Sequence, residues 1–158
     1  MMIAHSSRKI GRTVLRRVRE SLLGGITHVT TEAPVAALTF DDGPHPDYTP
    51  RLLDLLARYN ARATFFLLGK FAIQYPALVQ CMAEAGHAIG NHSWDHASFP
   101  FLTGRQRRAQ IRACAQAIAP YGQRLFRPPY MEQNLSSRLD MLWMRYEVIL
   151  CDCDSGDW

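Results

Sequence analysis

From residue 35 onward, short apolar runs alternate with segments of helical periodicity, and no other feature of the sequence constrains the fold as strongly. The candidate strands cover residues 35–40, 63–68, 87–90, 125–127 and 147–151. Helical patterns lie between them, one with Thr49 as its expected cap and Pro50 as its first residue, another opened by a Thr103–Gln106 capping box. Such alternation with short connections predicts parallel strands joined by right-handed crossovers. We therefore expect one α/β domain built on a parallel sheet.

Polar clusters follow four of these five candidate strands. They occupy residues 41–42, 92–96, 127–130 and 154–158. Because parallel strands end at one rim of a sheet or barrel, we expect the clusters to meet there and form one site. Their shared placement is stronger evidence than any single cluster.

Asp41 and Asp42 are adjacent carboxylates at a strand end, followed by Gly43 and Pro44 at the turn. Repulsion between two carboxylates this close raises the pKa of one of them, unless a bound cation compensates their negative charge. A bound metal would do so, with one Asp as a ligand and the other free as a base. A solvated Asp-Gly turn without any chemistry is the alternative.

His92 and His96 are four residues apart and can turn toward one point. Neutral imidazole is the commonest side-chain metal ligand, and two of them with one carboxylate leave positions open for water and substrate. Two unrelated surface or core histidines would be the better interpretation if the Asp pair were absent. Non-haem iron oxygenases use the same ligand types, but in those the Asp usually follows the first His, whereas here it comes first.

The third and fourth clusters resemble the walls of a groove. Pro128 and Pro129 fix the backbone and would hold Arg127 near the Asp pair, although a rigid loop with a surface arginine is the alternative. Residues 152–158 place alternating acids ahead of Trp158, which suits a sugar-binding rim. An incomplete calcium-type loop is the weaker alternative.

The net charge of +4 lies entirely in residues 1–33, and residues 34–158 are balanced. We therefore expect a basic, amphipathic N-terminal extension (1–33) ahead of the folded domain (34–158), and no nucleic-acid partner. The extension could contact an anionic membrane surface, act as a targeting peptide or form a solvated leader helix. It lacks the apolar stretch of a secretory signal, and no run approaches the ~20 apolar residues of a membrane span. A cytoplasmic or membrane-associated location is favoured.

Together, the four clusters resemble the motifs of the polysaccharide deacetylases, the NodB-homology family of carbohydrate esterases. Residues 39–44 read TFDDGP, residues 92–96 match H-S-x-x-H, residues 127–130 match R-x-P-Y, and residues 154–158 match D-x-x-D-W. They occur in the family's order, and the similarity extends over about residues 35–158. The resemblance implies a distorted (β/α) barrel.

The resemblance also implies a role for each matching residue. Asp41 is expected to be the general base, and Asp42, His92 and His96 are expected to hold a divalent metal. Zn²⁺ is the first expectation for this metal, with Co²⁺ or other divalent ions as alternatives. Arg127 would orient Asp41.

Further roles concern the walls of the groove. Ser93 would brace the histidine loop, and the backbone N–H of Tyr130 would face the developing oxyanion. Asp157 would tune the general acid. The residues expected to contact substrate are Pro129, Tyr130 and Trp158.

The sequence departs from the family pattern in two ways. The Leu-x-His motif, which supplies the general-acid histidine, does not occur before Trp158, and Met131 stands where the family usually has Gly. We therefore expect a barrel truncated at its C-terminus, with about five of seven to eight strands, that binds metal but turns over poorly.

The expected function is metal-dependent hydrolysis of N-acetyl groups on an N-acetylglucosamine-containing glycan, such as a chitooligosaccharide or peptidoglycan. Two alternatives stay open: an O-acetyl xylan esterase of the same fold, and a non-catalytic, metal-containing glycan-binding protein.

Overall fold

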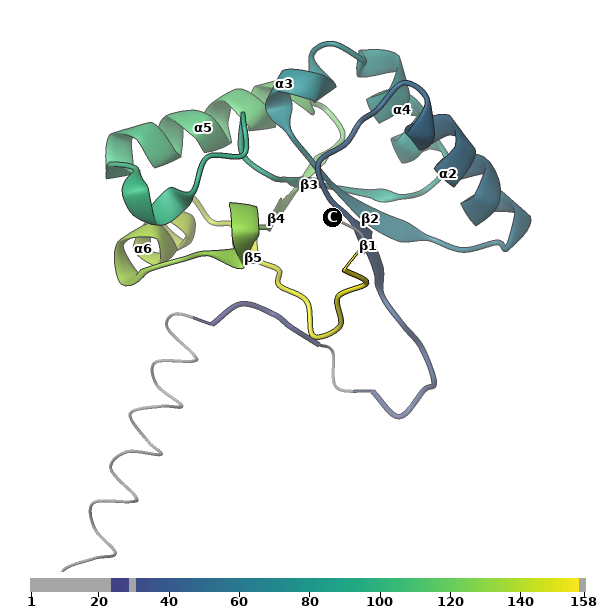
Figure 1. The fold of residues 1–158 in the computed structure, drawn as a ribbon, viewed down its shortest axis with the longest axis horizontal. Coiled ribbons are helices and arrows are strands. Elements are labelled where there is room, and N and C mark those ends of the chain that lie inside the picture. The colour runs from purple at the N-terminus through teal and green to yellow at the C-terminus, as the bar shows by residue number, and fades with distance from the viewer. Residues whose placement is uncertain (1–23, 29–30, 157–158) are drawn as a thin grey trace, which may run out of the picture.

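A computed structural model of the chain describes residues 24–28 and 31–156. Its strands form one parallel sheet in the order β1-β2-β3-β4-β5, and Figure 1 shows the sheet curled into part of a barrel with the helices in an arc around it. The strands are β1 (Leu38–Phe40), β2 (Ala63–Leu67), β3 (Ala88–Asn91), β4 (Gly122–Phe126) and β5 (Glu147–Val148). The helices are α2 (Tyr48–Arg58), α3 (Gly69–Ala72), α4 (Pro76–Glu84), α5 (Gly104–Ala117) and α6 (Leu135–Trp143), with 3₁₀ turns η1 (Phe99–Phe101) and η2 (Pro129–Met131). The predicted α/β fold, a partial (β/α) barrel, is confirmed.

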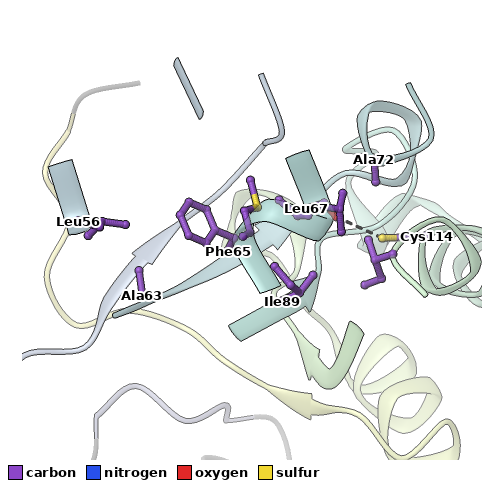
Figure 2. Close-up of a cluster of buried hydrophobic side chains, with 10 residues drawn as sticks. Leu56, Ala63, Phe65, Leu67, Ala72, Ile89 and Cys114 are labelled. Carbon is purple, nitrogen blue, oxygen red and sulfur yellow. Dashed lines mark hydrogen bonds between the residues drawn. The ribbon is translucent and has the colours of Figure 1, made fainter. Parts of the chain in front are cut away.

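The buried side chains explain the order of the layers. Phe65 and Leu67 of β2 belong to a cluster with residues of α2, α4, β3 and α5, and Figure 2 shows several of these side chains together. Phe66, between them in sequence, must point to the opposite face because strand side chains alternate. Gly90 on β3 leaves room for Phe66, since a Cβ at this glycine would lie 2.5 Å from the Phe66 ring.

A second buried cluster lies under α5 and α6. It contains Phe99, Ile111, Phe126, Met141, Tyr146 and Val148. The two helices are also joined by Asp140, whose carboxylate accepts hydrogen bonds from Arg107 and Arg108. This pairing explains why α6 buries Ser137, Asp140 and Met141, while its three leucines at 135, 139 and 142 are half exposed.

The beginning of α2 differs from the sequence-based expectation. The helix starts at Tyr48 with Asp47 at the cap position, so Thr49 lies in the first turn and Pro50 is not the first residue. The Thr49 hydroxyl accepts a hydrogen bond from the His45 amide, and His45 Nδ1 accepts from the Asp47 and Tyr48 amides. A histidine ring thus takes the capping role that the sequence pattern assigns to threonine.

Part of the N-terminal region adds to the sheet. Ile26 pairs in parallel with Ile149 beyond β5, through hydrogen bonds to Val148 O and from the Leu150 amide, both of 2.8 Å. The predicted amphipathic helix lies outside the described residues, so its contact with a membrane surface stays a prediction. The domain division after residue 33 and the location of the protein also stay predictions. Among the described helices, none combines the length and the apolar character that crossing a bilayer requires.

Candidate metal centre and active site

Asp42, His92 and His96 meet at the carboxyl end of the sheet. Asp42 follows β1, and the two histidines lie on the loop that follows β3. One ligand atom from each of the three side chains lies within 4.8 Å of the other two. Asp42 Oδ1 is 3.6 Å from His92 Nε2 and 3.5 Å from His96 Nε2.

These distances fit a metal ion better than direct hydrogen bonds. A hydrogen bond between nitrogen and a carboxylate oxygen spans about 2.7–2.9 Å. Two ligands of one tetrahedral ion, each about 2.0–2.1 Å from it, are about 3.3–3.4 Å apart. The observed separations lie near the second value, and two imidazoles with a carboxylate are a donor set that divalent transition metals accept. The three residues therefore fit such an ion.

The environment of His92 prepares one nitrogen for coordination. Its Nδ1 donates a 2.7 Å hydrogen bond to the Arg127 carbonyl, which leaves Nε2 facing Asp42. The ring is almost completely buried, and this burial lowers the pKa of His92 despite the opposing effect of Asp41. A neutral imidazole, fixed through its other nitrogen, is the form that binds a metal.

The loop that carries the histidines is held by its own polar groups. The Ser93 amide donates to Asn91 Oδ1 at 2.9 Å, and the Ser93 hydroxyl accepts from the His96 amide at 3.2 Å. Asn91 and Ser93 are fully buried. Ser93 therefore occupies the bracing position that the sequence resemblance implies, whereas Asn91 was not foreseen.

Asp41 lies beside this group and is held by Arg127. One terminal nitrogen (Nη1) of Arg127 donates to Asp41 Oδ1 and to Thr39 Oγ1, both at 2.8 Å. The other oxygen of Asp41, Oδ2, is 3.9 Å from His92 Nε2. Arg127 is buried and its guanidinium lies 4.3 Å from the centre of the Phe66 ring. One carboxylate oxygen is thus occupied, and the other faces the metal-ligand group.

Tyr130 forms the wall next to His96. Tyr130 is 63% exposed, and its ring meets the His96 ring edge-to-face, with 4.4 Å between centroids. Pro129 is buried, so Tyr130 presents more surface than Pro129 at this edge. The turn is tied to the histidine loop by a 2.5 Å hydrogen bond from the Ser98 hydroxyl to Glu132.

Left-handed backbone conformations are concentrated in the site. Of the seven non-glycine residues with positive φ in the described part of the chain, five lie here: Asp42, Ser93, His96, Tyr130 and Met131. Such residues cost about 1–3 kcal/mol each and persist where the surroundings impose them, often at functional sites. Met131 occupies the position where the resembling family usually has glycine, which adopts this conformation without strain.

Asp157 and Trp158 lie outside the described residues, so their predicted roles remain predictions. The other predicted site residues, Asp41, Asp42, His92, His96, Arg127, Pro129 and Tyr130, gather at one end of the sheet.

The sequence of this chain is similar to those of known proteins. The profile of the family described as "Polysaccharide deacetylase" matches residues 28–149. A peptidoglycan-N-acetylglucosamine deacetylase of Bacillus cereus is 37% identical over 128 residues, which is 77% of this chain and 46% of that protein. A chitooligosaccharide deacetylase of Azorhizobium caulinodans is 41% identical over 115 residues, which is 70% of this chain and 54% of that protein.

A solved structure shares the fold. The family 4 carbohydrate esterase of Streptomyces lividans, in complex with acetate, superposes with a TM-score of 0.75 at 39% identity, covering 78% of this chain and 65% of that one. The chain spans about half the length of the curated relatives it matches. On the match over most of its length, this chain belongs to the polysaccharide deacetylase family.

Proposed function

We propose that this site hydrolyses N-acetyl groups of an N-acetylglucosamine-containing polymer or oligomer with the help of a divalent metal ion. The observation that carries the proposal is the group of Asp42, His92 and His96 beside an Asp41 that Arg127 holds in place. The relatives named for peptidoglycan and chitooligosaccharide deacetylation support this class of substrate.

The metal would be held by Asp42 Oδ1, His92 Nε2 and His96 Nε2. When bound, such an ion polarises a carbonyl and lowers the pKa of water. Two nitrogens and one oxygen suit Zn²⁺, and Co²⁺ accepts the same donors. We propose Zn²⁺ as the ion.

Asp41 would act as the general base. Its Oδ1 accepts from Arg127, so Oδ2 is the atom that would receive the proton from the attacking water and pass it to the leaving amine as the carbon–nitrogen bond breaks. Arg127 keeps this carboxylate oriented because its guanidinium is buried and also donates to the carbonyls of Ile149 and Leu150, in the segment after β5. A positioned base of this kind contributes about 10²–10⁴-fold to a rate.

Tyr130 would serve at two places. Its backbone N–H is the proposed donor to the developing oxyanion, a contact whose loss typically costs about 3 kcal/mol. Its exposed ring, packed against His96, would contact a sugar of the substrate. The N-acetylated glycan is thus the proposed partner.

The test separates metal binding from chemistry with two substitutions. Asp42→Asn should lose most of the Zn²⁺ affinity, because one of three ligands is weakened. Asp41→Asn should keep that affinity and lose about 10²–10⁴-fold in acetate release. Asp54→Asn, on the exposed side of α2, is the matched control and should change neither.

Acetate release should be measured for the Zn²⁺-loaded full chain on chitooligosaccharide and, in parallel, on acetylated xylan. We expect release from the chitooligosaccharide and not from the xylan. Full Zn²⁺ affinity in Asp42→Asn would refute the ligand assignment. Metal binding with glycan affinity but without acetate release would instead indicate a binding protein.

A further inference from the structure

The histidine loop, residues 92–97, is also hydrogen-bonded by a side chain of α5, the next α-helix along the chain. Five consecutive amides, from Ser93 to Ala97, donate hydrogen bonds to side chains. Three of these five bonds end on Asn91, Ser93 and Asp95, which belong to the same segment. The other two end on Gln110 of α5.

Gln110 binds the part of the loop that separates the two histidines. Its side-chain oxygen, Oε1, accepts from the Trp94 amide at 2.8 Å and from the Asp95 amide at 3.2 Å. A carbonyl oxygen has two lone pairs, so one amide side chain can satisfy both donors. Trp94 and Asp95 lie between Ser93 and His96 in the sequence. Ser93 and His96 both have left-handed backbone conformations.

The helix that carries Gln110 is itself fixed to the sheet. The neighbouring residue, Ile111, is fully buried and its carbonyl accepts a 2.9 Å hydrogen bond from the Asn91 side chain. Cys114, one turn further on, donates to the Leu67 carbonyl. The side-chain oxygen of Gln110 therefore belongs to a helix that is itself hydrogen-bonded to the sheet.

We infer that Gln110 is a positioning residue for the metal site, which sets the spacing of His92 and His96 by holding the Trp94-Asp95 segment. The inference rests on the proposed function, because it assigns Gln110 a part in holding the ion of that site. It does not touch the ligands or the substrate. Changes in such outer contacts typically alter metal affinity by about 10- to 100-fold.

Two substitutions separate the acceptor from the shape of the side chain. Gln110→Met keeps the length and removes the acceptor, and we expect it to weaken Co²⁺ affinity by about 10- to 100-fold in a chelator competition. Gln110→Glu keeps an acceptor oxygen and should restore most of the affinity. Gln116→Met, on an exposed position of the same helix, is the matched control and should bind as the wild type does.

A readout without metal tests the same contact. In the presence of EDTA, hydrogen exchange of the amides of residues 94 and 95 should be faster in Gln110→Met than in the control, with similar urea midpoints for both variants. Wild-type Co²⁺ affinity in Gln110→Met would overturn the inference, and so would equal weakening in Gln110→Met and Gln110→Glu. A wild-type chain that binds no divalent ion would overturn the proposed function itself, and this inference with it.

Discussion

Arg127→Met is the substitution that tests most fully how the site is held together. The guanidinium of Arg127 donates to four acceptors at the ends of different strands. Two are side chains, Asp41 and Thr39, and two are the carbonyls of Ile149 and Leu150 at 3.3 and 3.2 Å. Methionine keeps most of the apolar stem and removes every donor.

The expected cost follows from the burial of the arginine. Arg127 is only 3% exposed, so water has little access to the acceptors that lose their hydrogen bonds when the guanidinium is removed. A buried acceptor left without a partner costs about 1–3 kcal/mol, and removing one member of a buried ion pair costs about 3–5 kcal/mol. Asp41 is partly exposed and can be hydrated after the change. We therefore expect the free energy of unfolding to fall by about 2–6 kcal/mol, about 1–3 kcal/mol for each of the two carbonyls left unpaired, and the proposed acetate release to be lost.

Urea unfolding in EDTA measures this cost without a contribution from bound metal. Arg124→Met provides the control, because Arg124 is an exposed arginine on β4 whose guanidinium lies 5.2 Å from the centre of the Tyr146 ring. An exposed contact of this kind is worth about 0.5–1 kcal/mol. Equal losses in the two variants would show that the buried hydrogen bonds of Arg127 do not hold the strand ends together.

Three further predictions concern buried contacts outside the metal-ligand group. Burial, together with Arg62, lowers the pKa of His87, whose Nδ1 accepts from the Ala63 amide. The stabilising contribution of neutral His87 should therefore be complete above pH 6.5 and fall below it, by at most about 1.4 kcal/mol per pH unit in urea unfolding, and this part of the pH dependence should be absent in His87→Phe. Asp140→Ala removes the carboxylate that pairs with buried Arg107 and should cost about 3–5 kcal/mol in the same assay. Gly69→Ala would place a Cβ 2.6 Å from the Trp94 ring, so thermal unfolding should show a loss of about 1–3 kcal/mol, and chelator competition a weaker Zn²⁺ affinity.

The sequence was informative where short-range patterns carry the information. Alternating strand and helix patterns predicted the parallel sheet, because both periods can be read within a few residues. The rule that parallel strands end at one rim predicted that the Asp pair and the two histidines would meet, and the structure places Asp42, His92 and His96 within 4.8 Å of one another. The capping box of Thr103 and Gln106 is also present as expected.

The supporting contacts could not be predicted in this way. Gln110 lies 14 residues after His96, in the middle of α5. Nothing in the sequence around it distinguishes it from the other polar residues of this helix. Asn91 could have been suspected, since a polar residue directly before His92 ends an otherwise apolar strand. The carbonyls that accept hydrogen bonds from Arg127 belong to the segment after β5, and only the folded chain brings that segment next to Arg127.

Boundaries also depended on the folded chain. Residues 35–37 continue the apolar run before β1 but lie outside the strand, and Val35 is 71% exposed. The start of α2 is displaced because His45 satisfies its first amides.

The most direct measurement is anomalous X-ray scattering at the zinc edge from crystals of the chain grown with Zn²⁺. The proposed metal site predicts one strong peak about 2.0–2.2 Å from Asp42 Oδ1, His92 Nε2 and His96 Nε2. A zinc peak bound by other residues, with none between these three side chains, would contradict it.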